Sequence, residues 1–264
     1  LFKIGLIVFS TFAICLIPFL NSIEQLLQII HRIFPVARGL YEDKVGNFWF
    51  SLSIIFKIRN VFSLQRLVQL RFISFLGIYA YLCSLITTIL SILPSCLYIF
   101  SKKVTSTQFM YSLAISSLGF FLFSFQVHEK HILLPLMPIT LLYPEMSFLS
   151  SWFNNIALFS MWPLLKKDQL LMPYIACSIL WNVATRESWS VSRSYKWPAI
   201  ISYLVIGILH AAELFIEPPA KWPDLYIVLN CLLSAAFFGF FFILLNLHLF
   251  FAKSAEDIRK IKRE

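Results

Sequence analysis

The sequence predicts an all-α, polytopic transmembrane protein with about eight helical spans. Hydrophobic residues make up 59% of the 264 residues, and 28 of them are phenylalanine. The mean hydropathy of +0.79 exceeds what a water-soluble domain can bury. Charged residues, only 13% of the chain, gather in short groups between long apolar stretches. This pattern indicates a single membrane domain over residues 1–264.

Charged and proline-rich breaks divide the chain into apolar segments, which we interpret as helices because about 20 helical residues cross a bilayer core. The eight segments cover residues 2–20, 72–98, 108–126, 131–144, 149–164, 169–185, 198–216 and 225–251. The fourth and fifth are short and contain Pro135, Pro138 and Pro163. We expect these two to tilt, kink or merge into a broken pair, which is tolerable only where protein surrounds them.

The N-terminal end has no features of a secretory signal. Residue 1 is Leu, and residues 1–20 lack a cationic start and a small-residue cleavage site. We therefore expect the chain to be the C-terminal part of a longer protein.

The distribution of Lys and Arg predicts the orientation in the membrane. The tail 253–264 has five basic and three acidic residues. The stretch Arg186–Lys196 has three basic residues and one acidic residue, and Lys102–Lys103 lies at another break between apolar segments. Eight alternating spans put these three groups on one side, which the positive-inside rule makes cytosolic. Residues 21–71 and the stretch Val127–Lys130 then face the opposite compartment.

The net charge of +9 and the five cysteines restrict the classes of partner. A basic chain suits phosphates and anionic lipid headgroups. Nucleic acid is not expected as a partner, because the basic residues lie between apolar spans and no binding motif is visible. The cysteines have neither a C-x-x-C pair nor metal-ligand spacing, so we interpret them as inert side chains facing lipid or core.

One polar cluster, VHEK, interrupts the apolar chain at the start of the fourth segment. His128 and Lys130 there adjoin the first N–H groups of a helix, a combination that suits an anion. Glu129 would cap or orient this site, and His131 would share a helical face with His128. The alternative is an ordinary solvated turn that ends a membrane span.

The second polar feature lies in residues 21–71, which we interpret as a re-entrant or interfacial loop. The triplet of Glu42, Asp43 and Lys44 sits among apolar residues that would let the loop enter the interface. Either one of the two carboxylates binds a sugar hydroxyl or a basic neighbour while the other faces water, or the triplet is a solvated loop tip. The loop is also rich in basic residues, so either the predicted orientation is wrong or these cations bind something: Arg32, Arg38, Lys44, Lys57, Arg59, Arg66 and Arg71.

Two stretches carry a resemblance to a known family. RIFPVARGLYEDKVGNFWF, residues 32–50, and FLFSFQVHEKHILLPLMPITLL, residues 121–142, resemble the signature stretches of dolichyl-phosphate-glucose-dependent α-1,3-glucosyltransferases of asparagine-linked glycosylation. LLKKDQLLMPY, residues 164–174, is also similar. The resemblance implies a GT-C fold in the endoplasmic reticulum membrane. Within the family, the EDKV form resembles the enzyme that adds the first glucose.

The resemblance also implies a mechanism and its residues. Glucose would pass with inversion from dolichyl phosphate glucose to a mannose of a dolichyl-diphosphate-linked oligosaccharide, with no metal and no cofactor. The general base is expected to be an aspartate in an N-terminal luminal loop that this chain does not contain. The implied lipid-phosphate residues are His128 and Lys130, next to Glu129; the implied residues of the luminal loop are Arg38, Glu42, Asp43 and Lys44.

The C-terminal residues KIKRE resemble a cytosolic dilysine retrieval signal, although a basic tail that only sets orientation is the alternative. Two other classes of function stay open: a lipid or solute transporter, and a non-catalytic membrane subunit. A transporter is expected to show repeated halves and ionisable residues at mid-membrane. We expect His210 and Glu213 to bond to a neighbouring helix rather than to relay protons.

Overall fold

The computed structural model describes residues 2–19, 22–33, 44–55, 73–101, 104–124, 127–191 and 195–251. The chain divides into two compact units, Leu1–Gly39 and Leu40–Glu264, which we describe separately. Of the residues predicted to contact substrate, Arg38, Glu42 and Asp43 lie outside the described residues. The basic tail 253–264 also lies outside them.

The described residues of the first unit form three helical elements: α1 (Phe2–Leu16), the 3-10 helix η1 (Ile17–Phe19) and α2 (Ile23–Ile33). Together α1 and η1 form an apolar stretch long enough to cross a membrane, as predicted for residues 2–20. Helix α2 lies in the region that we predicted only as a loop. The Ser22 hydroxyl accepts a hydrogen bond from the Gln25 N–H, which caps the start of α2.

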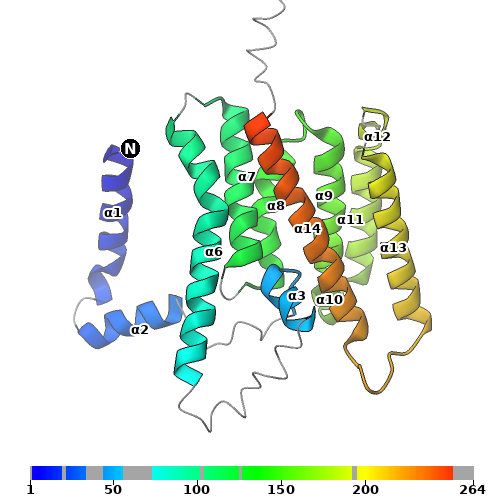
Figure 1. The fold of residues 1–264 in the computed structure, drawn as a ribbon, viewed down its shortest axis with the longest axis horizontal. Helices are drawn as coiled ribbons and strands as arrows, with labels where there is room; N and C mark the ends of the chain where they lie inside the picture. The colour runs from blue at the N-terminus through cyan, green and yellow to red at the C-terminus, as the bar shows by residue number, and fades with distance from the viewer. Residues whose placement is uncertain are drawn as a thin grey trace, which may run out of the picture. The chain divides into compact units, whose positions relative to one another are not determined.

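The second unit is a bundle of helices, and its described residues contain no β-strand. Figure 1 shows its longer helices running roughly side by side. The elements are α3 (Phe48–Ile55), α6 (Ile73–Ser101), α7 (Ser106–Phe123), η2 (Glu129–Ile132), α8 (Leu133–Leu141), α9 (Ser147–Ser160), α10 (Trp162–Lys167), α11 (Leu171–Ala184), α12 (Ser188–Val191), α13 (Lys196–Phe215) and α14 (Leu225–Phe251).

The predicted all-α membrane class is confirmed, and each of the eight predicted segments contains a helix. Within the described residues, five apolar helical stretches have the length and composition to cross a membrane. They cover Phe2–Phe19, Leu82–Phe100, Ser106–Phe123, Lys196–Phe215 and Leu225–Phe251. Helices α8, α9 and α11 are shorter, so the number of spans stays a prediction.

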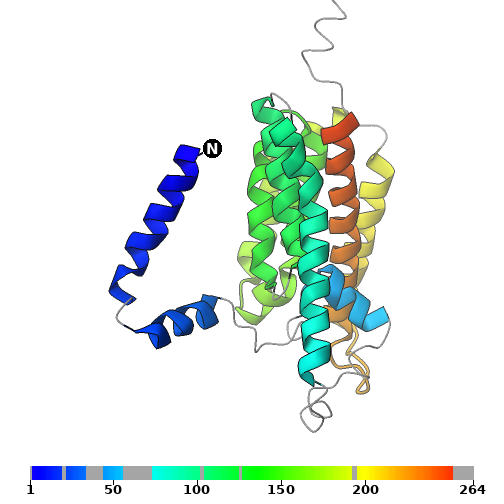
Figure 2. The same cartoon turned by 60° about the vertical axis from the view of Figure 1, so that its left-hand side comes forward.

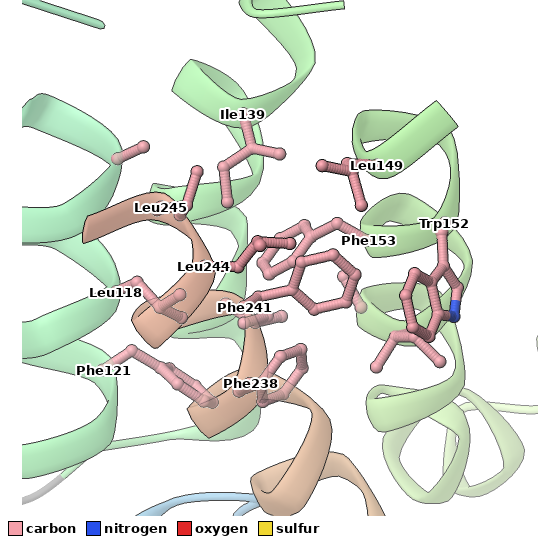
Figure 3. Packing of buried hydrophobic residues seen from close by; sticks show 14 of the residues in the cluster. Leu118, Phe121, Ile139, Leu149, Trp152, Phe153, Phe238, Phe241, Leu244 and Leu245 are labelled. Carbon is pink, nitrogen blue, oxygen red and sulfur yellow. The ribbon is translucent and has the colours of Figure 1, made fainter. Parts of the chain in front are cut away.

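The core of the second unit lies where α7, α8, α9 and α14 meet, and Figure 3 shows its side chains interdigitating. The rings of Phe153 and Phe241 are 5.1 Å apart at 88°, an edge-to-face pair that is worth about 0.5–1.5 kcal/mol beyond its buried area. Lipid tails are as apolar as these side chains, so close packing rather than escape from water holds the helices together.

Helix α9 is the most enclosed element of this core. Its 14 residues extend about 21 Å, less than a bilayer core of about 30 Å. Most of its side chains are buried. Asn154 bonds to Thr140 of α8, and Asn155 donates to Asn182 of α11. Protein therefore surrounds this short segment, as we expected, although α8 and α9 are separate helices.

Helices α6 and α7 meet along a seam of small residues. Ser84, Thr88 and Ser95 of α6 are buried, and the Ser95 hydroxyl lies 3.3 Å from that of Ser116 on α7. A Cβ atom on Gly119 would come within 2.8 Å of the Ser91 hydroxyl. Small side chains allow this close approach, which is how helices associate within membranes.

The alternating helices give the bundle two distinct ends. Helices α3 and α10 and the first turns of α14 lie at one end, whereas α12 and the last turns of α14 lie at the other (Figure 1). Figure 2 also shows α3 beside the first turns of α14. The end that holds α3 is called the site end below.

Candidate functional site

The VHEK cluster forms a compact turn at the site end. Val127 before the turn and Ile132 at its end are both buried, so two apolar anchors hold the polar residues between them. The His131 N–H donates to the His128 carbonyl at 3.0 Å. In return, His131 Nδ1 accepts the His128 N–H at 3.1 Å. The capping hydrogen bond of this turn thus involves His131. We expected Glu129 to cap or orient the site, and its orienting role stays a prediction.

The side chains of this turn project from a rigid base. His128, Glu129 and His131 are partly exposed and Lys130 is exposed. The rings of His128 and His131 lie 5.4 Å apart, as expected for residues three apart on one helical face. Burial, followed by the positive surroundings of His128 and Lys130, lowers the pKa of His131 below its ordinary value of 6.5. A neutral His131 suits its role as hydrogen-bond acceptor.

The stretch from Lys44 to Phe50 packs tightly against α14. Val45 and Asn47 are buried, and the Asn47 side-chain oxygen accepts the Phe50 N–H at 2.9 Å, which caps α3. Gly46 lies so close to α14 that a Cβ atom there would approach the Ser234 Cβ to 2.8 Å. Only glycine permits this contact without movement of the helix.

Trp49 joins this stretch to the VHEK turn. Its indole N–H donates to the carbonyl oxygen of Phe123, the last residue of α7, at 2.7 Å. The chain continues from Phe123 directly into the turn. Trp49 is only 6% exposed, so its side chain packs inside the protein. The hydrogen bond between Trp49 and Phe123 therefore joins the two signature stretches, which are far apart in sequence, at the end of α7.

Charged groups from three elements meet beside this junction. The Lys44 ammonium lies 2.6 Å from a carboxylate oxygen of Asp224, directly before α14. The Cys231 thiol on α14 donates to the Lys44 carbonyl at 3.1 Å, and Glu129 lies near the same thiol. The structure thus brings predicted residues of the loop and of the VHEK turn to one place.

A second polar cluster, which we call the clasp, lies at the site end between α10, α11 and α13. Glu213 accepts the Trp162 indole N–H at 2.6 Å and the Lys166 ammonium at 2.7 Å. The Tyr174 hydroxyl lies 2.9 Å from His210 Nε2. His210 and Glu213 therefore bond to neighbouring helices, as predicted.

Two residues near the site were not recognised from the sequence. Asp224 directly precedes an apolar run, which is a helix-start signal that could have identified it. Cys231 has no local signal; it is buried, as expected for a cysteine that faces the core, and its thiol also bonds to the loop. Within the described ranges, no group of three or more His, Cys, Asp or Glu residues is arranged to hold a metal ion.

Comparison with known proteins extends this picture. Three relatives are dolichyl pyrophosphate Man9GlcNAc2 alpha-1,3-glucosyltransferases by name. The Schizosaccharomyces pombe protein, named as probable, is 41% identical over 245 residues, 89% of this chain and 45% of its own length. The Saccharomyces cerevisiae protein is 37% identical over 273 residues, 89% of this chain and 47% of its own. The Pongo abelii protein is 35% identical over 290 residues, 99% of this chain and 54% of its own.

The chain thus spans about half the length of these curated relatives. Residues 1–244 match the ALG6, ALG8 glycosyltransferase family, and this range includes both signature stretches. The match confirms the resemblance inferred from those stretches. Because it covers most of the sequence, this chain belongs to the ALG6, ALG8 glycosyltransferase family.

Proposed function

We propose that the protein of which this chain is part transfers glucose from dolichyl phosphate glucose to a mannose of the dolichyl-diphosphate-linked Man9GlcNAc2 oligosaccharide. The reaction is an inverting α-1,3-transfer in protein N-glycosylation at the endoplasmic reticulum membrane. The names of the relatives support the linkage and the acceptor. The observation that carries the proposal is the junction of the two signature stretches at Trp49 and Phe123.

The VHEK turn is proposed to hold the donor phosphate. Negative charge accumulates on that phosphate as its bond to glucose breaks, so fixed donors stabilise the transition state more than the bound donor. His128 and Lys130 supply these donors, while Glu129 orients the cluster. The hydrogen bonds between His128 and His131 keep the backbone in place, so little reorganisation is needed during the reaction.

From the resemblance, the loop residues Arg38, Glu42 and Asp43 are proposed to contact substrate. Replacing Asp43 by Asn should then lower transfer about tenfold through loss of a charge-assisted hydrogen bond. The resemblance assigns the general base to an aspartate in an N-terminal luminal loop. We therefore give that role to none of the carboxylates in this chain.

The site end is proposed to face the lumen, with α12 and the tail 253–264 in the cytosol. Glycosylation acceptor sequons inserted near Gly46 and near Ser190 provide the test. We expect modification near Gly46 alone. Modification near Ser190 alone would show the opposite orientation. It would also contradict the proposal that the VHEK turn holds the donor phosphate.

The proposed activity is tested with the full-length protein in nanodiscs, given dolichyl phosphate glucose and the lipid-linked oligosaccharide. His128→Ala should lower single-turnover transfer by about tenfold to a thousandfold, the range for loss of one such donor. Donor binding should weaken less, because the lipid tail still partitions into the bilayer. Arg186→Ala, which removes an exposed cation at the other end of the bundle, is the matched control.

The same assay separates the alternatives. Wild-type protein that binds both lipids without transferring glucose would indicate a non-catalytic subunit. In sealed proteoliposomes, movement of a lipid or solute across the membrane without glucose transfer would indicate a transporter. Normal transfer by well-folded His128→Ala would leave VHEK as an ordinary interfacial turn.

A further inference from the structure

Lys44 makes two contacts with the N-terminal end of α14 and the residue directly before it. Its ammonium pairs with Asp224 at 2.6 Å, and its carbonyl accepts the Cys231 thiol at 3.1 Å. Asp224 and Cys231 lie before and within the first two turns of α14. The side chains of Lys44 and Asp224 are 31% and 51% exposed, so the ion pair forms at a partly solvated surface.

Asp224 itself has a fixed position. Its carbonyl accepts the Val228 N–H at 3.0 Å, which joins it to the first turn of α14. The Tyr226 hydroxyl donates to the Ile216 carbonyl at 2.8 Å and closes the loop between α13 and α14. The carboxylate therefore reaches Lys44 from a well-defined turn.

The chain after Lys44 leads from this pair to the VHEK turn. Gly46 lies against Ser234 on α14, and Trp49 bonds to Phe123 where α7 ends. A shift at Lys44 would thus move the segment that supports the start of the turn. Glu129 of the turn lies near the Cys231 thiol, which donates to the Lys44 carbonyl.

We propose that Asp224 and Cys231 are positioning residues, and that Lys44 promotes transfer through its pair with Asp224 rather than by binding the substrate phosphate. This inference rests on the proposed function of the VHEK turn. An exposed ion pair contributes little to stability by itself. Its value lies in geometry, because a small displacement of groups that hold a reacting phosphate slows the reaction strongly.

Exchange of the two charges tests the proposal. In full-length protein, Asp224→Asn should lower turnover about two- to fivefold, as expected for loss of a partly exposed pair. Asp224→Lys and Lys44→Asp should each lower it about tenfold or more, because each places like charges together. The double exchange should recover most of the turnover, with an unchanged KM for the donor.

Two outcomes would overturn the inference. A double variant as slow as Lys44→Asp alone would show that Lys44 contacts the substrate directly. Normal turnover in both single charge reversals would show that the pair positions nothing. Glu217→Gln removes an exposed carboxylate from the same loop and is the matched control for Asp224→Asn.

A readout without catalysis separates this inference from the proposed function. The Cys231 thiol is 2% exposed while it bonds to Lys44. In protein with every other cysteine replaced by alanine, a charged, membrane-impermeant thiol reagent should modify Cys231 faster in Asp224→Asn than in wild type or Glu217→Gln. Equal rates would contradict the positioning role even if transfer activity is found. Faster modification of Cys231 in Asp224→Asn, in protein that transfers no glucose, would support the positioning role of the ion pair and contradict the proposed enzymatic function.

Discussion

The two polar clusters at the site end use similar side chains in opposite ways. In the clasp, both Glu213 carboxylate oxygens are occupied, one by Trp162 and one by Lys166. In the VHEK turn, the two hydrogen bonds between His128 and His131 fix the backbone, whereas the Lys130 side chain is exposed. A network whose members satisfy one another stabilises a fold. Charge that is presented from a rigid turn is available to a ligand.

This difference predicts which substitutions affect transfer and which affect folding. Changes in the VHEK turn should lower turnover and leave the unfolding temperature almost unchanged. Changes in the clasp should do the reverse. The predictions below test that separation.

The largest effect is expected when Lys130→Ala is combined with His128→Ala. Each variant alone should lower single-turnover transfer by about tenfold to a thousandfold. If both side chains serve one phosphate, the double variant should lose less than the product of the two factors. Fully multiplicative losses in the quantified single-turnover rates would argue for two independent roles.

Next in size is Glu213→Ala in the clasp. This change leaves the Trp162 indole N–H without its acceptor, at a cost of about 1–3 kcal/mol in the free energy of unfolding. Thermal unfolding in detergent should show the loss, while turnover per folded molecule stays within about twofold. Glu217→Ala on the exposed loop is the control. A large fall in turnover at normal stability would give the clasp a role in the reaction.

Gly46→Ala tests the close approach of the loop to α14. The added methyl group would lie 2.8 Å from the Ser234 Cβ and 3.3 Å from the Cys231 carbonyl oxygen. We expect a destabilisation of about 1–3 kcal/mol from this overpacking, together with slower transfer. Gly239→Ala on α14 meets no atom within 4 Å and should stabilise the helix by about 0.5–1 kcal/mol. Equal stability and equal transfer rates in the two variants would mean that the loop around Gly46 can move away from α14 at little cost.

The smallest effect concerns pH. Because the folded state lowers the pKa of His131, the unfolded chain binds the proton more readily. The stabilising contribution is therefore present above the ordinary value of 6.5 and is lost as the pH falls through the lowered folded pKa. As the pH falls from about 8 to 5, the unfolding temperature of His131→Asn should decline less steeply than that of the wild type. Parallel curves for both proteins would contradict this.

Sequence reasoning found the long helices and the VHEK turn, because apolar length and an abrupt polar cluster are local signals. It missed α2 and α3 inside the predicted loop. The Ser22 cap and the apolar spacing after it were readable, whereas Phe48–Ile55 is a short apolar run that a loop entering the interface shares. The bond between Cys231 and Lys44 joins residues 187 apart in the chain. One sequence carries no local trace of such a contact.

The enclosure of α9 has a consequence for how the protein is made. A nascent segment of 14 residues that includes Asn154 and Asn155 is a poor substrate for independent insertion into lipid. Its covering partners on α13 and α14 leave the ribosome later, among them Ser202, which accepts the Trp152 indole N–H at 2.9 Å. We therefore expect α9 to stay in a protected, partly polar environment until α13 and α14 have been synthesised and pack against it. Truncation before α13 should leave it accessible to protease or to a membrane quality-control factor.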